Sequence, residues 1–243
     1  MLTLYTGTPG SGKSYHATER IDLWLRQGKN VISTYPIKTN KHHKGIFKFV
    51  PLLQISVDYL LHFSSENHKP KKEDQTLVVI DEAHILFNSR GFNVKERIKW
   101  LQFLALSRHY GYDFILITQN DRAIDRQVRG LIEYNVKHRN LAGFGVKGWL
   151  LIFVLHKKFV AIKMWYVNNE QCSREFFNIR RRITSLYDTF AMFDEYDEDL
   201  PVPQTVKLIS PSDFNSQRKC NTKSSPGELL LQKDCITKDG ETA

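Results

Sequence analysis

The chain has 243 residues, of which 41% are hydrophobic and 25% are charged, as in an ordinary globular domain. Its formal net charge of +9 and pI near 9.4 favour a polyanionic partner, either nucleic acid or an anionic membrane surface, although charge that serves solubility alone would look the same. The three cysteines are odd in number and lack C-x-x-C spacing, so a disulfide framework or a zinc site is not expected.

The first motif, GTPGSGKS at residues 7–14, follows an apolar strand predicted over residues 2–6. A helical pattern begins directly after the motif, runs to about Gln27 and has Gly28 as its C-terminal cap. The glycines let backbone N–H groups turn toward a phosphate, Lys13 can reach the β- and γ-phosphates, and the hydroxyl of Ser14 can ligate Mg²⁺. We therefore predict a nucleotide-binding loop with ATP and Mg²⁺ as cofactors, and the preference for ATP over GTP stays open. The motif fits G-x-x-x-x-G-K-[ST] at every fixed position and consists of Gly7, Thr8, Pro9, Gly10, Ser11, Gly12, Lys13 and Ser14.

The second motif lies at the end of a later strand. Four apolar residues at 77–80 are typical of a strand that is buried on both faces of a parallel sheet. Asp81 and Glu82 follow at its carboxyl end, where ligands bind in open α/β sheets. Asp81 is placed to hold Mg²⁺, and Glu82 is placed to polarise the attacking water. Between the two motifs we predict strands over 31–37 and 46–50, a helix over 52–63 and an exposed loop over 64–75.

A third candidate is the polar end of the next buried strand, predicted over 113–118. The strand ends in Thr118 and Gln119, and a polar side chain beside the strand of the second motif can sense the γ-phosphate. A hydrogen-bonded strand terminus would also need polar groups, so both explanations stay open for Gln119. Helices are predicted over 95–110 and over 122–133, the second as a basic amphipathic helix with Arg122, Arg126 and Arg129 outward.

The most apolar stretch, residues 148–167, follows a strand predicted over 134–141. It is interrupted by charged residues at 157, 158 and 163, and each charge at the centre of a membrane helix costs about 2.5–3.5 kcal/mol. We therefore predict a β-hairpin that turns at 156–158, with a transmembrane span as the minor alternative.

A second basic cluster and a change of composition follow. Arg174 and Arg180–Arg182 lie among aromatic residues, an arrangement that suits stacking on single-stranded nucleic acid and equally suits a packed sheet edge. Residues 188–199 are rich in acidic side chains, and polar residues dominate after them. We predict an acidic and then polar tail over 191–243 that is poorly ordered.

Several stretches together are more specific than either motif alone. They are GTPGSGKS at 7–14, VVIDEAH at 78–84, FNSR at 87–90, SRHYGYD at 107–113, ILITQ at 115–119, Ile124-Asp125, Arg129 and LYDT at 186–189. In these stretches the sequence resembles the zonular occludens toxin (Zot) family, which includes the assembly ATPases of filamentous phages. The resemblance covers residues 1 to about 190, and the block from 107 to 119 is far more discriminating than the nucleotide loop, which many families share.

The resemblance implies an α/β P-loop NTPase of the FtsK/HerA-like group, with a mostly parallel central sheet flanked by helices and an added C-terminal hairpin. The ATPase domain would occupy residues 1–190 and would use ATP to drive extrusion and assembly of phage that contains single-stranded DNA. Its implied partners are single-stranded DNA, phage coat and assembly proteins and a host inner-membrane protein.

The resemblance also implies a homo-oligomeric ring in which an arginine from one subunit completes the site of its neighbour. The candidates are Arg108, Arg122, Arg126 and Arg129, and Arg108 is the first choice because it lies in the discriminating block. Many relatives carry a transmembrane helix after the ATPase domain. No credible span follows here, so the expected location is the host cytoplasm, peripheral to the inner membrane.

Two other functions stay open. One is a nucleotide-dependent assembly switch or scaffold that does not translocate DNA, and the other is a small-molecule P-loop kinase. The adjacent Asp81 and Glu82, which suit water activation, and the lack of an obvious Arg-rich lid argue against the kinase. Replacing Glu82 with Gln separates a motor, which would bind ATP without turnover, from a scaffold, which would keep functioning.

Overall fold

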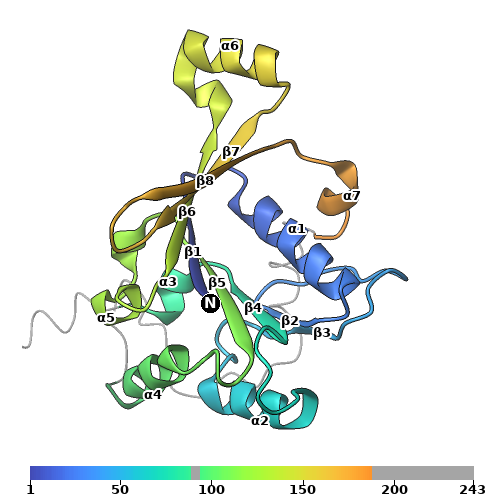
Figure 1. Ribbon diagram of the computed structural model, residues 1–243, viewed down its shortest axis with the longest axis vertical. Helices are drawn as coiled ribbons and strands as arrows, with labels where there is room; N and C mark the ends of the chain where they lie inside the picture. The colour runs from blue at the N-terminus through green and yellow to red at the C-terminus, as the bar shows by residue number, and fades with distance from the viewer. Residues whose placement is uncertain (89–93, 188–243) are drawn as a thin grey trace, which may run out of the picture. The chain divides into compact units, whose positions relative to one another are not determined.

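Strands and helices alternate along the chain, and the strands form one 8-stranded mixed sheet (Figure 1). The computed structural model describes residues 1–88 and 94–187, apart from the side chains of Lys147 and Leu151. The predicted tail over 191–243 lies outside the described residues. Positions 89, 90, 188 and 189, which belong to the stretches that resemble the Zot family, also lie outside them. The strands are β1 (Leu2–Thr6), β2 (Asn30–Ser33), β3 (Phe47–Phe49), β4 (Thr76–Ile80), β5 (Tyr112–Ile117), β6 (Tyr134–Asn140), β7 (Phe159–Trp165) and β8 (Gln171–Phe177). The α-helices are α1 (Lys13–Arg26), α2 (Val57–Asn67), α3 (Ala83–Leu86), α4 (Val94–Ala105), α5 (Arg126–Arg129), α6 (Gly145–Leu155) and α7 (Arg181–Thr184), and the 3₁₀ turns are η1 (Asp121–Ala123) and η2 (Leu141–Phe144).

The order of the strands brings the predicted motifs to one edge of the sheet. The order is β3-β2-β4-β5-β1-β6-β7-β8. The first six strands in this order are parallel to one another, and β7 pairs antiparallel with both β6 and β8. β5 lies between β1 and β4, so the carboxyl ends of these three strands are neighbours. The predicted mostly parallel sheet with added C-terminal strands is confirmed, although the added hairpin is β7–β8 and not the one predicted within 148–167.

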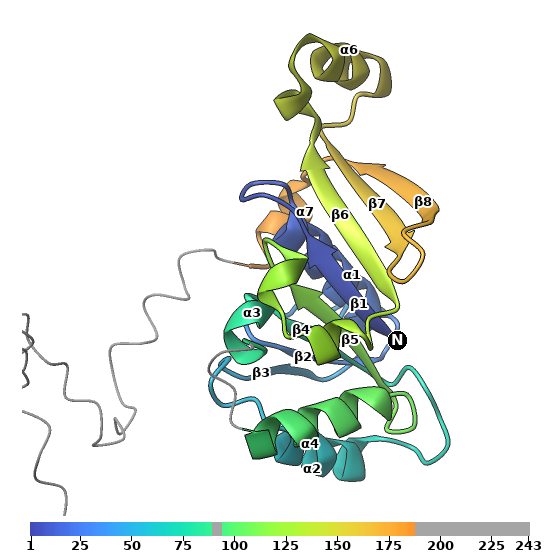
Figure 2. The same cartoon turned by 90° about the vertical axis from the view of Figure 1, so that its left-hand side faces the viewer.

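Each central strand contributes alternate residues to two hydrophobic cores. On one face, Val78 and its neighbours pack with Leu60 of α2 and Trp100 of α4. On the other face, Val79 and its neighbours pack with Ile21 of α1 and with residues of α7. Burial on both faces explains why these strands read as continuous apolar runs. Figure 2 shows α2 and α4 together, away from α1.

The helix predicted over 122–133 is wrong in its length. The segment forms only η1 and the single turn α5, and Ile124 between them is extended. Asn120 Oδ1 accepts a hydrogen bond from the backbone N–H of Arg122, and Asp125 Oδ1 accepts one from that of Gln127. Two side-chain caps so close together start two short turns in place of one helix, because each cap satisfies helix-terminal N–H groups locally.

The hairpin predicted within 148–167 is also wrong in its first half. Residues up to Leu155 form α6, and β7 begins only at Phe159. β7 pairs with β6 on one side and β8 on the other, so the apolar run before it serves as a helical connection between β6 and β7. A short apolar run does not distinguish strand from helix by periodicity, which explains the error.

Several predicted boundaries also shift by a few residues. β2 ends at Ser33, α2 continues to Asn67 into the predicted loop, and α4 ends at Ala105, after which residues 106–110 form turns. α1 ends as predicted, with Gly28 in a left-handed conformation of φ 76° directly after its cap.

Asp22 joins three segments behind the sheet. Its buried carboxylate accepts hydrogen bonds from Arg26 Nε at 2.9 Å and pairs with His43 Nε2 at 3.1 Å and Arg182 Nη1 of α7 at 3.2 Å. Burial by itself favours the neutral acid, but the hydrogen bonds from His43 and Arg26 and the charge of Arg182 hold the pKa of this carboxyl below its usual value. The ionised Asp22 therefore fastens α7 and the loop before β3 to α1.

Candidate nucleotide-binding site

The loop between β1 and α1 has a backbone shape that requires glycine. Gly7, Gly10 and Gly12 have φ values of 148°, 70° and 90°. A methyl group on Gly7 would overlap the carbonyl oxygen of His138 and the hydroxyl of Ser11. The bare backbone therefore packs directly against β6, and the loop leads into α1, a helix of 14 residues whose N-terminus can meet an anion.

Lys13 and Ser14 lie at the start of α1, where the sequence predicts them. Lys13 Nζ donates hydrogen bonds to the carbonyl oxygens of Gly7 at 2.9 Å and Thr8 at 3.1 Å, so the ammonium group lies over the loop. Ser14 Oγ donates to Asp81 Oδ2 at 3.3 Å across 67 positions of sequence. The structure thus brings the two predicted Mg²⁺ ligands together.

Asp81 has the surroundings of a carboxylate that a cation would stabilise. Burial raises the pKa of the Asp81 carboxyl, and the nearby charge of Glu82 raises it further, whereas the hydrogen bonds from the Glu82 backbone N–H and the Ser14 hydroxyl oppose the shift. The Asp81 N–H donates to Thr34 Oγ1 at 2.8 Å, which fixes the end of β4. A half-buried carboxylate beside a hydroxyl is an all-oxygen donor set of the kind that Mg²⁺ prefers, so these residues fit the ion.

Glu82 follows in an uncommon backbone conformation. Its φ of 48° and ψ of 44° place it in the left-handed region, which non-glycine residues rarely adopt. Its side chain is 43% exposed, and Oε2 lies 3.1 Å from Nδ1 of His84. The turn thus carries the carboxylate of Glu82 next to the half-buried one of Asp81.

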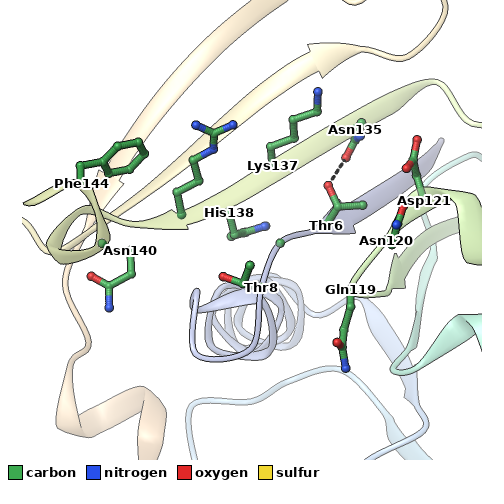
Figure 3. A pocket seen from close by; sticks show the side chains of 13 residues that line it. Thr6, Thr8, Gln119, Asn120, Asp121, Asn135, Lys137, His138, Asn140 and Phe144 are labelled. Atoms are coloured by element: carbon green, nitrogen blue, oxygen red, sulfur yellow. Dashed lines mark hydrogen bonds between the residues drawn. The ribbon is translucent and has the colours of Figure 1, made fainter. Parts of the chain in front are cut away.

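Gln119 lines a pocket together with Gly7 and Thr8 of the nucleotide loop, whereas Lys13, Ser14, Asp81 and Glu82 are not among its lining residues. This pocket has a volume of about 610 Å³, and its side chains come from the loop after β1, the loop after β5, and β6 with the turn that follows (Figure 3). Thr6 Oγ1 donates to Asn135 Oδ1 at 2.8 Å and ties β1 to β6 there. The contribution of β6 was not predicted from the sequence, because its alternate polar positions indicate a polar face but not the pairing with β1 that brings this face to the nucleotide loop. The lining residues are Thr6, Gly7, Thr8, Gln119, Asn120, Asp121, Asn135, Lys137, His138, Arg139, Asn140, Gly143 and Phe144.

Arg108 lies at the opposite edge of the sheet. It precedes β5, and its Nη2 lies 2.6 Å from Oε2 of Glu133, which precedes β6. The nucleotide loop follows the carboxyl end of β1, so Arg108 is not brought together with Lys13, Asp81 and Glu82 of its own chain. Its side chain is 54% exposed to solvent. Arg122 lies closer to the site, directly after Asn120 and Asp121, which line the pocket.

Two buried histidines support the nucleotide loop from behind. His16 Nδ1 lies 2.8 Å from His138 Nε2, and His138 Nδ1 lies 3.0 Å from the carbonyl oxygen of Val136. His138 therefore donates from Nδ1 and accepts from His16 at Nε2, as a pair of neutral imidazoles. Burial lowers the pKa of His16 to about 3 and that of His138 to about 4.

The central parallel sheet, the glycine loop that leads into α1, and Asp81 at the end of β4 define a P-loop NTPase fold. The model of the family "Zonular occludens toxin (Zot)" matches residues 1–188. The chain belongs to this family, and the resemblance inferred from its motifs is confirmed.

Named relatives are proteins of filamentous phages, and the matches cover less than half of their length. The chain is 31% identical over 143 residues to the gene 1 protein of Escherichia phage If1, a match that covers 56% of this chain and 40% of the relative. It is 28% identical over 137 residues to the gene 1 protein of Enterobacteria phage M13, covering 54% of this chain and 39% of the relative. The N-terminal domain of zonular occludens toxin from Neisseria meningitidis has a similar fold, with a TM-score of 0.51 and 18% identity over 77% of this chain and 98% of that one.

Proposed function

We propose that this chain hydrolyses ATP with Mg²⁺ and that hydrolysis drives a step in the assembly or extrusion of a filamentous phage. The observation that carries the proposal is the convergence of Ser14, at the start of α1, on Asp81, at the end of β4, with Oγ and Oδ2 3.3 Å apart. Two motifs that are far apart in sequence thereby form one site at the carboxyl edge of the sheet.

The residues of the site divide the chemistry of phosphoryl transfer between them. The backbone N–H groups of Gly7–Ser14 and the ammonium group of Lys13 bind and orient the phosphates. Ser14 and Asp81 would hold Mg²⁺, which supplies positive charge against the phosphate oxygens when bound. Glu82 orients and deprotonates the attacking water, and Gln119 at the neighbouring strand end contacts the γ-phosphate or that water.

An arginine from a neighbouring subunit completes the site in this proposal. Arg108 faces away from the nucleotide loop of its own chain and is half exposed, which suits a role only in trans. Such an arginine stabilises the charge that develops on the transferred phosphoryl group. The proposal therefore includes a homo-oligomer, with a ring as the simplest closed arrangement.

The proposed partners follow from charge and from the relatives. The net charge of +9 suits single-stranded DNA and the surface of an anionic membrane. A relative in Pseudomonas phage Pf3, ORF301, is named as a candidate assembly protein, which supports coat and assembly proteins as further partners. We place the protein in the host cytoplasm, peripheral to the inner membrane, where a host membrane protein would join the assembly.

Steady-state ATP hydrolysis tests the proposal, with and without single-stranded DNA. The purified full chain should turn over ATP in the presence of Mg²⁺, and Lys13→Ala and Glu82→Gln should each remove about 2–4 kcal/mol of transition-state stabilisation. Glu82→Gln should still bind ATP. Glu66→Gln, an exposed carboxylate on α2, is the matched control and should turn over like the wild type.

The outcomes separate three functions. Turnover that DNA stimulates and both variants lose supports a motor that acts on DNA, whereas DNA-independent turnover favours a protein substrate. Stoichiometric ATP binding with no turnover under any of these conditions would refute the motor and favour the assembly switch.

A further inference from the structure

Helix α6 exposes more large apolar side chains than a free surface normally carries. Figures 1 and 2 both show α6 beyond the ends of β6 and β7, separate from the other helices. Exposed apolar side chains are ordinary when they are scattered, but a contiguous group marks a surface that another apolar phase covers. The most exposed are Val146 (87%), Phe153 (77%), Trp149 (66%), Leu150 (65%) and Val154 (64%).

The helix is nevertheless held in a defined position. Gly148 is its buried contact point, and a methyl group there would overlap the carbonyl oxygen of Leu141 in η2. On its other side, Asn178 Nδ2 donates to the carbonyl oxygen of His156 at 2.6 Å, and Asn178 Oδ1 accepts from the backbone N–H of Lys158. The contacts at both ends fix the helix while its apolar side chains remain outside the two cores of the sheet.

The charge around α6 is of one sign. Between Glu133 and Glu170 the sequence contains no acidic residue. Arg139 and Lys158 are exposed near the base of the helix, and Lys157 is half-buried beside them. Positive charge around an apolar projection complements an anionic lipid surface, whereas the apolar face of a second copy would bring the same positive charges together.

The length of α6 suits insertion into one leaflet. Its 11 residues span about 16 Å, roughly half of the ~30 Å hydrocarbon core of a bilayer. Within residues 1–88 and 94–187, no helix has both the length and the apolar character needed to cross a bilayer. A short helix that is apolar on most sides and has basic neighbours can bury its apolar side chains at the boundary of the acyl region while the basic groups stay among the lipid headgroups.

A second pocket at the base of α6 has the composition of a lipid site. It has a volume of about 340 Å³, and two arginines, Arg139 and Arg174, stand among apolar side chains that include Val160, Ile162 and Phe176. Guanidinium groups bind phosphate oxygens, and the apolar walls suit an acyl chain. Arg139 and Phe144 also line the pocket beside the nucleotide loop, so the two pockets share a wall.

We infer that α6 inserts into the interface of an anionic phospholipid membrane, with Trp149 and Phe153 in the acyl region and Arg139, Lys157 and Lys158 on the lipid phosphates. This inference rests on the membrane location that forms part of the proposed function, and it names the element responsible. Attachment to lipid requires no nucleotide, so its test is independent of ATP hydrolysis.

Flotation of the full chain with vesicles tests the inference. Vesicles of phosphatidylcholine with one third phosphatidylglycerol are compared with phosphatidylcholine alone, at roughly physiological salt. The wild type should float with the anionic vesicles, and the double variant Trp149→Ser/Phe153→Ser should bind them at least about tenfold more weakly, because most of the inserted apolar area is gone. Leu53→Ser, which removes a side chain that is 80% exposed elsewhere, should float like the wild type.

Charge variants separate local attraction from a diffuse one. Lys157→Gln/Lys158→Gln should weaken flotation several-fold, and Lys41→Gln/Lys48→Gln, in a basic stretch away from α6, should not. Far-UV circular dichroism and thermal melts confirm that each variant is folded.

Two results would overturn the inference. One is equal flotation of the wild type and Trp149→Ser/Phe153→Ser. The other is a wild type that floats with neither kind of vesicle. If the wild type then also forms an oligomer that the double variant dissociates, a second copy of the chain covers α6. If the chain hydrolyses ATP but its flotation does not depend on α6, the proposed enzymatic function stands and the inference on α6 fails. If flotation depends on α6 but the chain does not hydrolyse ATP, the inference on α6 stands and the proposed enzymatic function fails.

Discussion

Acid should destabilise this domain through the buried imidazoles of His16 and His138. Both are neutral in the folded protein, because burial lowers their pKa values to about 3 and about 4. A second proton would place two positive charges on rings whose nitrogens lie 2.8 Å apart. In the unfolded chain each imidazole titrates near its ordinary pKa of 6.5, so the unfolded state binds more protons between pH 6.5 and pH 4.

The sign and size of the effect follow from proton linkage. Because the folded pKa values lie below the unfolded ones, the contribution of the pair is complete above pH 6.5 and is lost as the pH falls toward the folded values. At about pH 5, keeping one imidazole neutral in the folded state lowers the free energy of unfolding by about 2 kcal/mol relative to its value above pH 6.5. The two imidazoles together lower it by up to about 4 kcal/mol. This loss is a large fraction of the stability of a typical domain.

Urea denaturation at about pH 7.5 and about pH 5 measures the loss. The double variant His16→Asn/His138→Gln places amide groups near the positions of the paired nitrogens and removes both titrations, so its free energy of unfolding should change less between the two pH values. His62→Gln is the control, because this imidazole is 74% exposed. Parallel losses of stability in the wild type and the double variant would refute the assignment to this pair.

Three further predictions concern the site and the core. Gly7→Ala should lower the free energy of unfolding by about 1–3 kcal/mol and weaken nucleotide binding, whereas Gly10→Ala, which has φ 70° and an open neighbourhood, should cost about 1 kcal/mol; denaturation and fluorescent-nucleotide titration measure both. If Arg108 acts in trans, Lys13→Ala and Arg108→Ala should each abolish turnover alone, and mixed subunits should regain part of it; no recovery on mixing would exclude the trans role. Phe87→Ala should cost about 3–5 kcal/mol in urea denaturation, because Phe87 is fully buried and packs edge-to-face on a tryptophan, and a loss below about 1 kcal/mol would contradict that packing.

The nucleotide site could be predicted from sequence because its parts are local. The loop at Gly7–Ser14 combines a strand, glycines and a helix start within a few residues, and Asp81 directly follows a buried strand. The parallel sheet then brings both ends to the same edge, as its topology requires. The roles of Glu82 and Gln119 in catalysis stay predictions.

The contributions of β6 and α6 depend on tertiary context and were not predictable. Lys137 and Arg139 line the pocket beside the nucleotide loop only because β6 pairs with β1, a long-range choice that no local pattern records. The apolar run in α6 became a helix because β7 takes β6 as its antiparallel partner and leaves the run between them. Arg108 shortly precedes the strand predicted over 113–118, so the parallel sheet places it at the amino edge, opposite the two motifs that follow their strands.

The contacts of Asp22 make α7 and α1 a single mechanical unit. The carboxylate holds Arg182 of α7 and Arg26 of α1 at once, and the backbone N–H of Arg180 donates to the hydroxyl of Tyr15 at 3.1 Å. A load applied to the chain at the end of α7 would therefore reach α1, which begins with Lys13 and Ser14, through these side-chain contacts as well as through the core that α7 shares with the sheet. We expect tension on that end of the chain to act on the helix that starts at the nucleotide loop.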